Sequence, residues 1–254
     1  MGTQFKDRTA LVTGAGRGIG RELAGQLAAE GATVALVARS HTELTETARQ
    51  VRADGGRAHV VAADLADAGQ RAEAVRQVRE ACGAVDILIN NAGMVAPMGP
   101  SAELDPADWA AALELNLTAA ATLTFALLPA MLARGWGRVV NVSSGVVASP
   151  GFMVGGNAYA TSKAALEAHT VNLAAELAGT GVTANVYRPG AVDTAMQAWI
   201  RGRDPERLGA GLHDHFARNH ERGQLITPAA SARSMLARLG GDGTGQIWHV
   251  ADPL

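Results

Sequence analysis

The sequence is poor in cysteine, in aromatic residues and in excess charge of either sign. Its 254 residues include one cysteine, Cys82, which excludes a disulfide framework and a cysteine-based metal site within one chain. Aromatic residues make up only 4% of the chain, so an aliphatic core is expected and a base-stacking surface is not indicated. Lys and Arg number 22 against 24 Asp and Glu, a net charge of −2. We therefore expect no nucleic-acid partner.

Signals that would direct the chain to a membrane are also missing. No apolar run approaches the roughly 18 residues of a membrane span. No hydrophobic signal segment follows Met1, and Lys6 stands where a myristoylation pattern requires Ser or Thr. These absences predict a cytoplasmic protein with no membrane partner.

Short apolar runs alternate with longer segments of helical period. The predicted strands are Thr9–Thr13, Thr33–Ala38, Ala58–Ala62, Ile87–Asn90, Arg138–Val142, Thr183–Tyr187 and Ile247–Val250. The predicted helices are Gly18–Glu30, Thr42–Ala53, Gly69–Ala81, Pro106–Ala133, Ala158–Ala178 and Pro228–Leu239. This alternation implies right-handed crossovers and strands covered on both faces. We predict an α/β fold with a doubly wound parallel sheet of about seven strands and helices on both faces.

Residues 191–227 form the least regular stretch, rich in charge and histidine. Because the stretch follows the carboxyl end of a predicted strand, it is a candidate lid over a ligand crevice. His213, His215 and His220 suggest a metal site within it. Two histidines at i and i+2 do not share a helical face, however, and no third ligand is evident, so we expect no metal.

A glycine-rich loop joins the first predicted strand to the first predicted helix. Residues 13–20 read TGAGRGIG, spaced T-G-x-x-x-G-x-G rather than the common G-x-G-x-x-G. Glycines let the backbone approach a pyrophosphate, and the helix N-terminus offers free N–H groups and the positive end of its dipole. The position of the loop favours dinucleotide binding over a plain tight turn. Arg17 favours an anion in either case.

Tyr159 and Lys163 stand four residues apart in a predicted helix, so their side chains share a face. Both residue types are scarce, since the chain has two tyrosines and its only other lysine is Lys6. A free tyrosine has a pKa of about 10, and a nearby ammonium lowers that pKa by favouring the phenolate. The pattern favours a proton-transfer pair acting on a carbonyl or an alcohol over a surface Tyr–Lys pair.

Taken together, these residues resemble the short-chain dehydrogenase/reductase family in its compact form, over nearly the whole chain. The resemblance implies a single-domain Rossmann fold over residues 1–254 that binds NAD(P), with the lid at about 191–227. Asp64-Leu65 is similar to the family's adenine-contacting pair. Asn90-Asn91-Ala92-Gly93 is similar to its NNAG motif, and Pro189–Thr194 is similar to its PG motif. An alternative for Asp64 is to cap the following helix. The implied cofactor-binding residues are Gly14, Arg17, Gly18, Ile19, Gly20, Arg39, Ser40, Asp64, Leu65, Asn91, Ala92, Gly93, Tyr159, Lys163, Pro189, Gly190, Val192 and Thr194.

The same resemblance implies a catalytic set of Asn116, Ser144, Tyr159 and Lys163. Tyr159 would be the general acid in reduction, Ser144 would orient the carbonyl, and Lys163 would hold the nicotinamide ribose and lower the tyrosine pKa. Asn116 would kink its helix and hold a relay water. Ser143 stays open as an alternative to Ser144, and a purely structural role stays open for Asn116.

Two departures from the family pattern stand out. Arg188 precedes the PG motif, where a small or neutral polar residue is common. The chain ends in VADPL, without the Asp-Gly-Gly that helps build one tetramer interface. The long helices that carry Asn116 and Tyr159 can still pair across a two-fold axis, so we expect a homodimer or a homotetramer.

The second predicted strand decides the cofactor. It ends in Ala38, where a family member that prefers NAD usually has Asp, and Arg39 and Ser40 follow. Arg17 in the glycine loop can approach the same place from the other side of the cofactor, and no carboxylate occurs before Glu43. The guanidiniums of Arg17 and Arg39 therefore fit the 2′-phosphate of NADP(H). The alternative is that Arg39 is only a solvated residue and both cofactors serve. We predict NADP(H).

These features predict an NADPH-dependent reductase that converts a ketone or aldehyde to an alcohol, reversibly. An NAD-dependent alcohol dehydrogenase is an alternative, and a dinucleotide sensor without chemistry is a third, disfavoured because it has no need of a catalytic set. The substrate is a small carbonyl or alcohol whose identity the sequence does not reveal. A mostly apolar pocket, or ordinary core, is suggested by Met94, Met98, Phe152, Met153, Met196 and Trp199.

Overall fold

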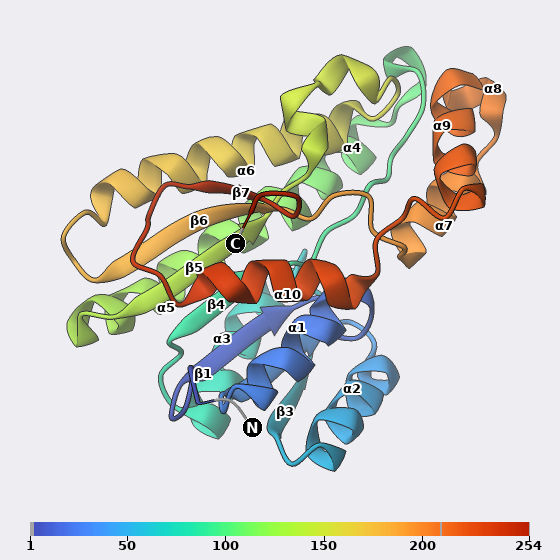
Figure 1. Cartoon of the computed structure of the whole chain (residues 1–254). Coiled ribbons are helices and arrows are strands. Elements are labelled where there is room, and N and C mark those ends of the chain that lie inside the picture. Colours follow the sequence, from blue (N-terminus) through green and yellow to red (C-terminus); the bar gives the residue numbers. More distant parts are fainter. Residues whose placement is uncertain (1–2, 209, 254) are drawn as a thin grey trace.

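The structure, a computed structural model, describes residues 3–208 and 210–253 and contains one parallel sheet (Figure 1). Its strands in this part of the chain are β1 (Thr9–Thr13), β2 (Thr33–Ala38), β3 (Arg57–Ala62), β4 (Ile87–Asn90), β5 (Gly137–Val142), β6 (Val182–Arg188) and β7 (Ile247–His249). They lie in the order β3-β2-β1-β4-β5-β6-β7. The predicted single-domain Rossmann fold with a sheet of seven strands is confirmed.

Helices connect the strands and cover both faces of the sheet (Figure 1). They are α1 (Gly18–Ala29), α2 (His41–Ala53), α3 (Ala68–Cys82), α4 (Pro106–Leu113), α5 (Ala119–Arg134), α6 (Asn157–Glu176), α7 (Ala195–Arg201), α8 (Pro205–Leu208), α9 (Ala210–Glu221) and α10 (Pro228–Leu239). Several begin at a side-chain cap: Ser40 accepts from the Glu43 N–H at α2, and Thr227 accepts from the Ala230 N–H at α10.

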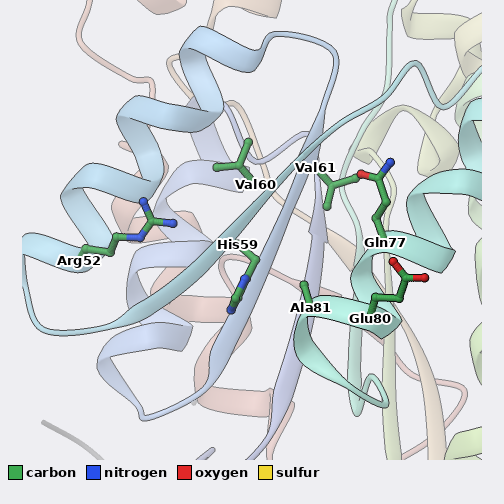
Figure 2. A pocket seen from close by; sticks show the side chains of 7 residues that line it. All are labelled: Arg52, His59, Val60, Val61, Gln77, Glu80 and Ala81. Carbon is green, nitrogen blue, oxygen red and sulfur yellow. The ribbon is translucent and has the colours of Figure 1, made fainter.

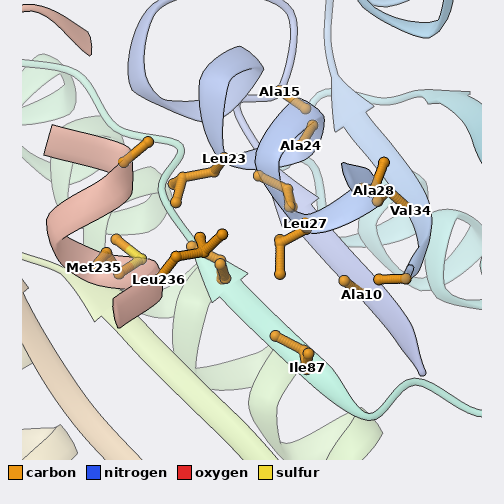
Figure 3. Packing of buried hydrophobic residues seen from close by; sticks show 14 of the residues in the cluster. Ala10, Ala15, Leu23, Ala24, Leu27, Ala28, Val34, Ile87, Met235 and Leu236 are labelled. Carbon is orange, nitrogen blue, oxygen red and sulfur yellow. The ribbon is translucent and has the colours of Figure 1, made fainter. Parts of the chain in front are cut away.

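Alternate residues of each strand feed two aliphatic cores. In β1, Ala10 and Val12 pack under α1 and α10, whereas Leu11 faces α3 and α5 on the other side. Figure 3 shows the first core, where Leu23 and Leu27 of α1 meet α10 above the sheet. Because both faces are covered, the strands read as unbroken apolar runs, as the sequence suggested.

The predicted helix Pro106–Ala133 is interrupted. Between α4 and α5 the chain makes a π-helical turn, η2 (Glu114–Thr118), with Asn116 at its centre. A π-turn adds a residue to the helical ladder, which displaces the backbone locally. The regular α-helical hydrogen bonding is therefore interrupted at Asn116, the residue at which the resemblance implied a kink.

The expectation that no segment approaches a membrane span was too strict. Taken together with the π-turn between them, α4 and α5 form a continuous helical stretch over residues 106–134 that is long and apolar enough to cross a membrane by length and composition. Buried core helices meet the same criterion, and here Leu123, Leu127 and Met131 pack against the sheet. The core accounts for these apolar residues of the helix, whereas Phe125 and Leu132 on its outer face are exposed.

The expectation of an irregular lid was wrong, because residues 191–227 contain α7, α8 and α9, which stand together at one end of the molecule (orange in Figure 1). Buried residues of these helices, Ile200, Leu208 and Leu212, pack into a third core with Tyr159. The two ends of the segment are joined, since Val192 pairs with Ile226 in a parallel bridge. Position 209, a glycine within this segment, lies outside the described residues.

The strand order reverses between β1 and β4. From β1 the next strands, β2 and β3, are added on one side, and from β4 the strands β5, β6 and β7 are added on the other. In such a sheet, ligands bind in the crevice outside the carboxyl ends of the strands at this switch point. The candidate site is therefore expected beyond Thr13 and Asn90, the last residues of β1 and β4.

Candidate active site

The residues predicted for the site follow the carboxyl ends of β1 to β6, and so lie along one edge of the sheet. The glycine loop follows β1, Arg39-Ser40 follows β2, Asp64-Leu65 follows β3, Asn91–Gly93 follows β4, Ser144 follows β5 and Pro189–Thr194 follows β6. Tyr159 and Lys163 reach the same edge from α6, and Asn116 reaches it from the π-turn.

The glycine loop leaves no room for side chains at two of its positions. Gly14 has φ +65°, and a Cβ there would lie 2.8 Å from Asn91 Nδ2. A Cβ at Gly20 would collide with the Gly14 carbonyl. Ile19, between them, packs on the core of α1, while the N-cap Arg17 makes no side-chain cap. The free N–H groups at the start of α1 are thus left open to an anion.

Asn91 and Thr13 tie the ends of β1 and β4 together. The Asn91 side chain donates to the Thr13 carbonyl at 2.9 Å. The backbone N–H groups of Asn91 and Ala92 each donate to Thr13 Oγ1 at 2.9 Å. The floor of the crevice is therefore fixed at the switch point where the fold predicts a ligand.

Asn116 clamps the segment that follows β4. Its Oδ1 accepts from the Met94 N–H at 2.8 Å, and its Nδ2 donates to the Met94 carbonyl at 2.8 Å and to Ser162 Oγ at 3.0 Å. Gly93 sits just before this clamp, where a Cβ would lie 3.1 Å from Asn116 Oδ1. Because both amide N–H bonds are taken by protein, a relay water would have to meet the oxygen atoms of Asn116.

Tyr159, Ser144 and Lys163 converge beside this clamp. The Ser144 hydroxyl hydrogen bonds with the Tyr159 phenol, which is 8% exposed. Lys163 Nζ donates to the Val142 carbonyl at 2.8 Å and lies 5.9 Å from the centroid of the Tyr159 ring. Ser143 points elsewhere, to Glu167, so the geometry favours Ser144 as the partner of the phenol.

Burial sets the titration of both groups. It raises the pKa of Tyr159, against the smaller lowering effect of the Ser144 hydrogen bond. The sequence led us to expect that the nearby ammonium lowers the pKa of Tyr159, and this expectation is wrong for the chain by itself, because burial is the larger effect. Burial lowers the pKa of Lys163 to about 8, with a partly opposing effect from Glu167. The lysine is thus placed to lose or keep its proton near neutral pH.

The PG segment closes the crevice from the other side. Gly190 has φ +76°, and a Cβ there would lie 2.7 Å from Val250 Cγ1. Thr194 lies against the glycine loop, since a Cβ on Gly18 would be 3.4 Å from its Cγ2. The loop after β6 therefore approaches the loop after β1 where Thr194 lies beside Gly18.

The carboxylate of Glu43, in the first turn of α2, lies near the end of β2, and the sequence reasoning gave it no role. Arg39 is exposed, and Arg17, whose side chain is 64% exposed, pairs with Glu43 at 3.3 Å. Glu43 also lies against Gly16, where a Cβ would be 2.9 Å from its Oε2. The signal was present, because Ser40 to Glu43 is a capping-box sequence that returns the third residue of the helix toward the cap. Two guanidiniums and one carboxylate therefore share this corner.

Asp64 and Leu65 follow β3 as predicted. The Asp64 carboxylate accepts from the Ala66 N–H at 3.0 Å, and Leu65 is buried. Asp67, not Asp64, caps α3, so the alternative role of Asp64 as a helix cap is wrong.

A cavity of about 560 Å³ lies between α4, the loop after β4 and the lid helices α7 and α8. Of the residues suggested for the pocket, Met94, Met98 and Trp199 line it. Met153 and Met196 belong to the core beneath, and Phe152 is 52% exposed. The cavity is more polar than expected, because its lining includes Asp108, Arg203, Asp204 and Arg207.

A second hollow, at the outer edge of the sheet, contains none of the residues predicted for the site. It lies between α2, β3 and the end of α3, and Figure 2 shows Arg52, His59 and Glu80 around it. Charged side chains at the edge of a sheet also serve to discourage pairing with another chain.

Sequence reasoning missed a buried ion pair beside the predicted catalytic residues. Arg188, noted only as a departure, binds Glu167 with Nε–Oε1 2.8 Å and Nη2–Oε2 2.6 Å. Glu167 stands four residues after Lys163 on α6, a spacing that puts it on the same face and could have revealed it.

Comparison with known proteins adds a family and a set of relatives. The family model described as short chain dehydrogenase matches residues 8–204. A short chain dehydrogenase of Pseudocercospora fijiensis is 40% identical over 198 residues, 77% of this chain and 63% of the relative, so the chain spans less than two thirds of that protein. The short-chain reductase protein NovJ of Streptomyces niveus is 36% identical over 256 residues, 96% of this chain and 93% of NovJ.

Two solved structures with the same architecture contain different nicotinamide cofactors. A variant of actinorhodin polyketide ketoreductase with NADPH has a TM-score of 0.86 and 35% identity, and the match covers 98% of this chain and 97% of that one. An NAD+-bound xylitol dehydrogenase has a TM-score of 0.82 and 26% identity, over 96% and 98% of the two chains.

Proposed function

The chain belongs to the short-chain dehydrogenase/reductase family, and from this premise we propose that it is an NADPH-dependent reductase of a ketone or an aldehyde, acting reversibly. The observation that carries the proposal is the contact of Ser144 with the Tyr159 phenol, one helical turn from Lys163. A sensor would not require this arrangement, and the similar proteins include a polyketide ketoreductase and ketoacyl reductases.

The residues at the switch point fit a nicotinamide dinucleotide. A Cβ at Gly14 or Gly20 would fill the space beside Asn91, and the open start of α1 suits a pyrophosphate. When bound, the cofactor supplies the hydride. Gly14, Gly18, Asn91 and the segment Pro189–Thr194 would hold it, with Asp64-Leu65 at the adenine end.

The chain's own residues supply orientation and the proton. Ser144 donates a hydrogen bond that orients the substrate carbonyl, and the Tyr159 phenol donates the proton that the carbonyl oxygen gains. Burial keeps the phenol protonated, which suits an acid. Lys163 would hold the nicotinamide ribose, and Asn116 keeps the loop after β4 in place through Met94. The lid, residues 191–227, covers the site and excludes water.

Arg17 and Arg39 support NADPH as the preferred cofactor. Their guanidiniums suit a 2′-phosphate, and Ser40, although its oxygen caps α2, keeps a hydroxyl proton to donate. Glu43 supports a second candidate, an NAD-dependent alcohol dehydrogenase, because a carboxylate in this corner can accept from a ribose 2′-OH and repels a phosphate.

An absorbance assay tests the proposal. The protein is mixed with NADPH or NADH and a panel of ketones and aldehydes, and loss of the reduced cofactor is followed. We expect turnover with NADPH and a kcat/KM at least about tenfold above that with NADH, because a charge-assisted hydrogen bond contributes on the order of 1.5–3 kcal/mol. Equal values for the two cofactors would contradict the cofactor assignment, and a higher kcat/KM with NADH than with NADPH would favour the second candidate.

We further propose a cytoplasmic homo-oligomer, a dimer or a tetramer. The outer faces of α5 and α6 expose Phe125 at 56%, Leu132 at 40% and Val171 at 44%. Exposed apolar side chains on two neighbouring helices fit the same face of a second copy across a two-fold axis.

A further inference from the structure

A buried ion pair lies beside the catalytic set, and no role described above uses it. Glu167 follows Tyr159 and Lys163 on α6 at eight and four residues, and all three are buried. Arg188, the last residue of β6, holds both carboxylate oxygens of Glu167 at 2.8 and 2.6 Å. This is the two-point geometry that a guanidinium makes with a carboxylate. The side chains are 11% and 7% exposed, so solvent screens the pair little.

The same carboxylate holds the residue that precedes the catalytic serine. Ser143 Oγ donates to Glu167 Oε1 at 2.6 Å, and the Ser143 N–H donates to the Tyr187 carbonyl at 2.8 Å. Ser144, the next residue, hydrogen bonds with Tyr159. Since Ser143 is fixed by two bonds, the backbone from which Ser144 reaches the phenol is fixed as well. Glu167 thereby links α6, the loop after β5 and the end of β6.

The pair also determines which charges surround Lys163. The Arg188 guanidinium neutralises Glu167, so the ammonium meets a balanced pair one turn away rather than a bare carboxylate. Lys163 Nζ donates to the Val142 carbonyl at 2.8 Å, and a Cβ on Gly93 would lie 3.4 Å from it, so the ammonium points toward the crevice. A bare carboxylate would compete for this ammonium.

We propose that Arg188 and Glu167 are a positioning pair, which keeps Ser144 aligned with Tyr159 and keeps the Lys163 ammonium directed at the crevice. Neither residue touches the reacting atoms, since Glu167 acts through Ser143 and Lys163, and Arg188 acts through Glu167. The catalytic meaning of the pair rests on the proposed function.

The charged and polar groups facing this centre come from five elements of the described chain. The facing groups are Tyr159, Lys163 and Glu167 from α6, Ser143 and Ser144 from the loop after β5, Asn116 from the π-turn, Arg188 from β6 and His249 from β7. His249 Nε2 lies 3.4 Å from Arg188 Nη1 and is the remaining titratable neighbour.

Removal of one charge at a time gives shifts of opposite sign. Arg188→Met leaves a carboxylate near Lys163 and Tyr159, which favours their protonated forms, so we expect the apparent pKa of the phenol to rise by about 0.5–1 unit. Glu167→Gln leaves the guanidinium, and the same pKa should fall by a similar amount. The double variant should return it to within about 0.2 unit of the unmutated protein, and Arg188→Lys, which keeps the charge, should leave it in place. Each single variant should lose at least about tenfold in kcat.

The titration is measured directly as tyrosinate absorbance in the near ultraviolet, with NADP+ added. The chain has two tyrosines, and Tyr187 is buried with its hydroxyl bonded to the Ser231 carbonyl, so a Tyr159→Phe sample supplies the background. Arg138→Met is the matched control, because it removes another buried arginine near the amino-terminal end of β5, away from the carboxyl ends of the strands. This variant should leave the pKa of Tyr159 unchanged.

Opposite shifts that cancel in the double variant support the proposal. Single variants that keep the unmutated pKa, whatever happens to kcat, overturn it and reduce the pair to a structural bond. If Arg188→Met does not fold, the direction of the shift in Glu167→Gln decides alone. Because the titration needs no turnover, a protein that reduces no carbonyl would contradict the proposed function without deciding the role of the pair.

Discussion

At the scale of single residues, Arg17, Arg39 and Glu43 decide the cofactor together. Arg39→Ala should lower kcat/KM for NADPH by about tenfold or more and change that for NADH little, because one charge-assisted bond to the 2′-phosphate is lost. Glu43→Gln should act in the opposite direction. It frees Arg17 from an exposed ion pair worth at most about 1 kcal/mol, so the preference for NADPH should rise up to about fivefold. Kinetics with both cofactors measure this, and a Glu43→Gln protein that favours NADH would contradict it.

Lys163 should make stability depend on pH in a defined window. Its pKa is about 8 when folded, against an ordinary value of 10.5 when unfolded. Between these values the unfolded chain holds the proton and the folded chain does not, so stability rises with pH, by about 1.4 kcal/mol per unit at most. Relative to Lys163→Met, the unmutated protein should gain on the order of 1–2 kcal/mol between about pH 7.5 and 9.5. Urea unfolding of both proteins measures the difference, and a constant difference would contradict the buried charge.

Single residues also mark the limit of what the sequence could predict. The spacing of Tyr159 and Lys163 was informative because both residue types are scarce. Partners distant in sequence were not predictable: Glu167 meets Arg188 only because β6 lies beside β5, and Arg17 meets Glu43 only because α2 turns back over the loop. The periodicity of a short sequence segment does not predict contacts between residues that are far apart in the chain.

At the scale of elements, the lid is the segment whose stability should respond to cofactor. Its ends are joined by the Val192–Ile226 bridge, and α7 to α9 between them are short. We expect fast amide hydrogen exchange in residues 195–222 of the free protein and slower exchange when NADPH is bound, while β1 and β4 exchange slowly in both states. Slow exchange in the lid that cofactor leaves unchanged would remove the lid from the account.

Regular elements were predicted well where one pattern dominated. Buried strands such as β1 and β4 read directly from their apolar runs, and Pro228 placed the start of α10. The π-turn at Asn116 was not visible as such, because the Met94 backbone that Asn116 binds there is distant in sequence. The helices α7 to α9 were missed because α7 and α8 are short and α9 is rich in charged residues and histidine.

At the scale of the whole molecule, the exposed faces of α5 and α6 should pair two copies. Phe125 is 56% exposed there, in edge-to-face contact with His169 at 5.7 Å. Phe125→Asp should shift the protein to a smaller species in analytical ultracentrifugation, because a carboxylate in a buried interface is costly. Val154→Asp, at a residue 65% exposed elsewhere, is the matched control and should not change the mass. A monomer in the unmutated protein would contradict the assembly.

The architecture of the whole molecule, by contrast, was within reach of the sequence. Alternating strands and helices allow few topologies once right-handed crossovers are required. The strand order and its reversal at β1 and β4 then fix the edge at which Ser144, Tyr159 and Asn91 meet. The shape and polarity of the cavity depend on side chains such as Arg203 and Asp108, which no pattern marked.

The most direct test of the central claim is the turnover of Tyr159→Phe with NADPH and the best carbonyl of the panel. The variant keeps the ring in its buried place and removes the acidic proton. General acid catalysis contributes roughly 10²–10⁴-fold, so kcat should fall at least about a hundredfold while NADPH still binds and the protein stays folded. A Tyr159→Phe protein that retains a tenth of the unmutated turnover, in an assay limited by the chemical step, would contradict the account.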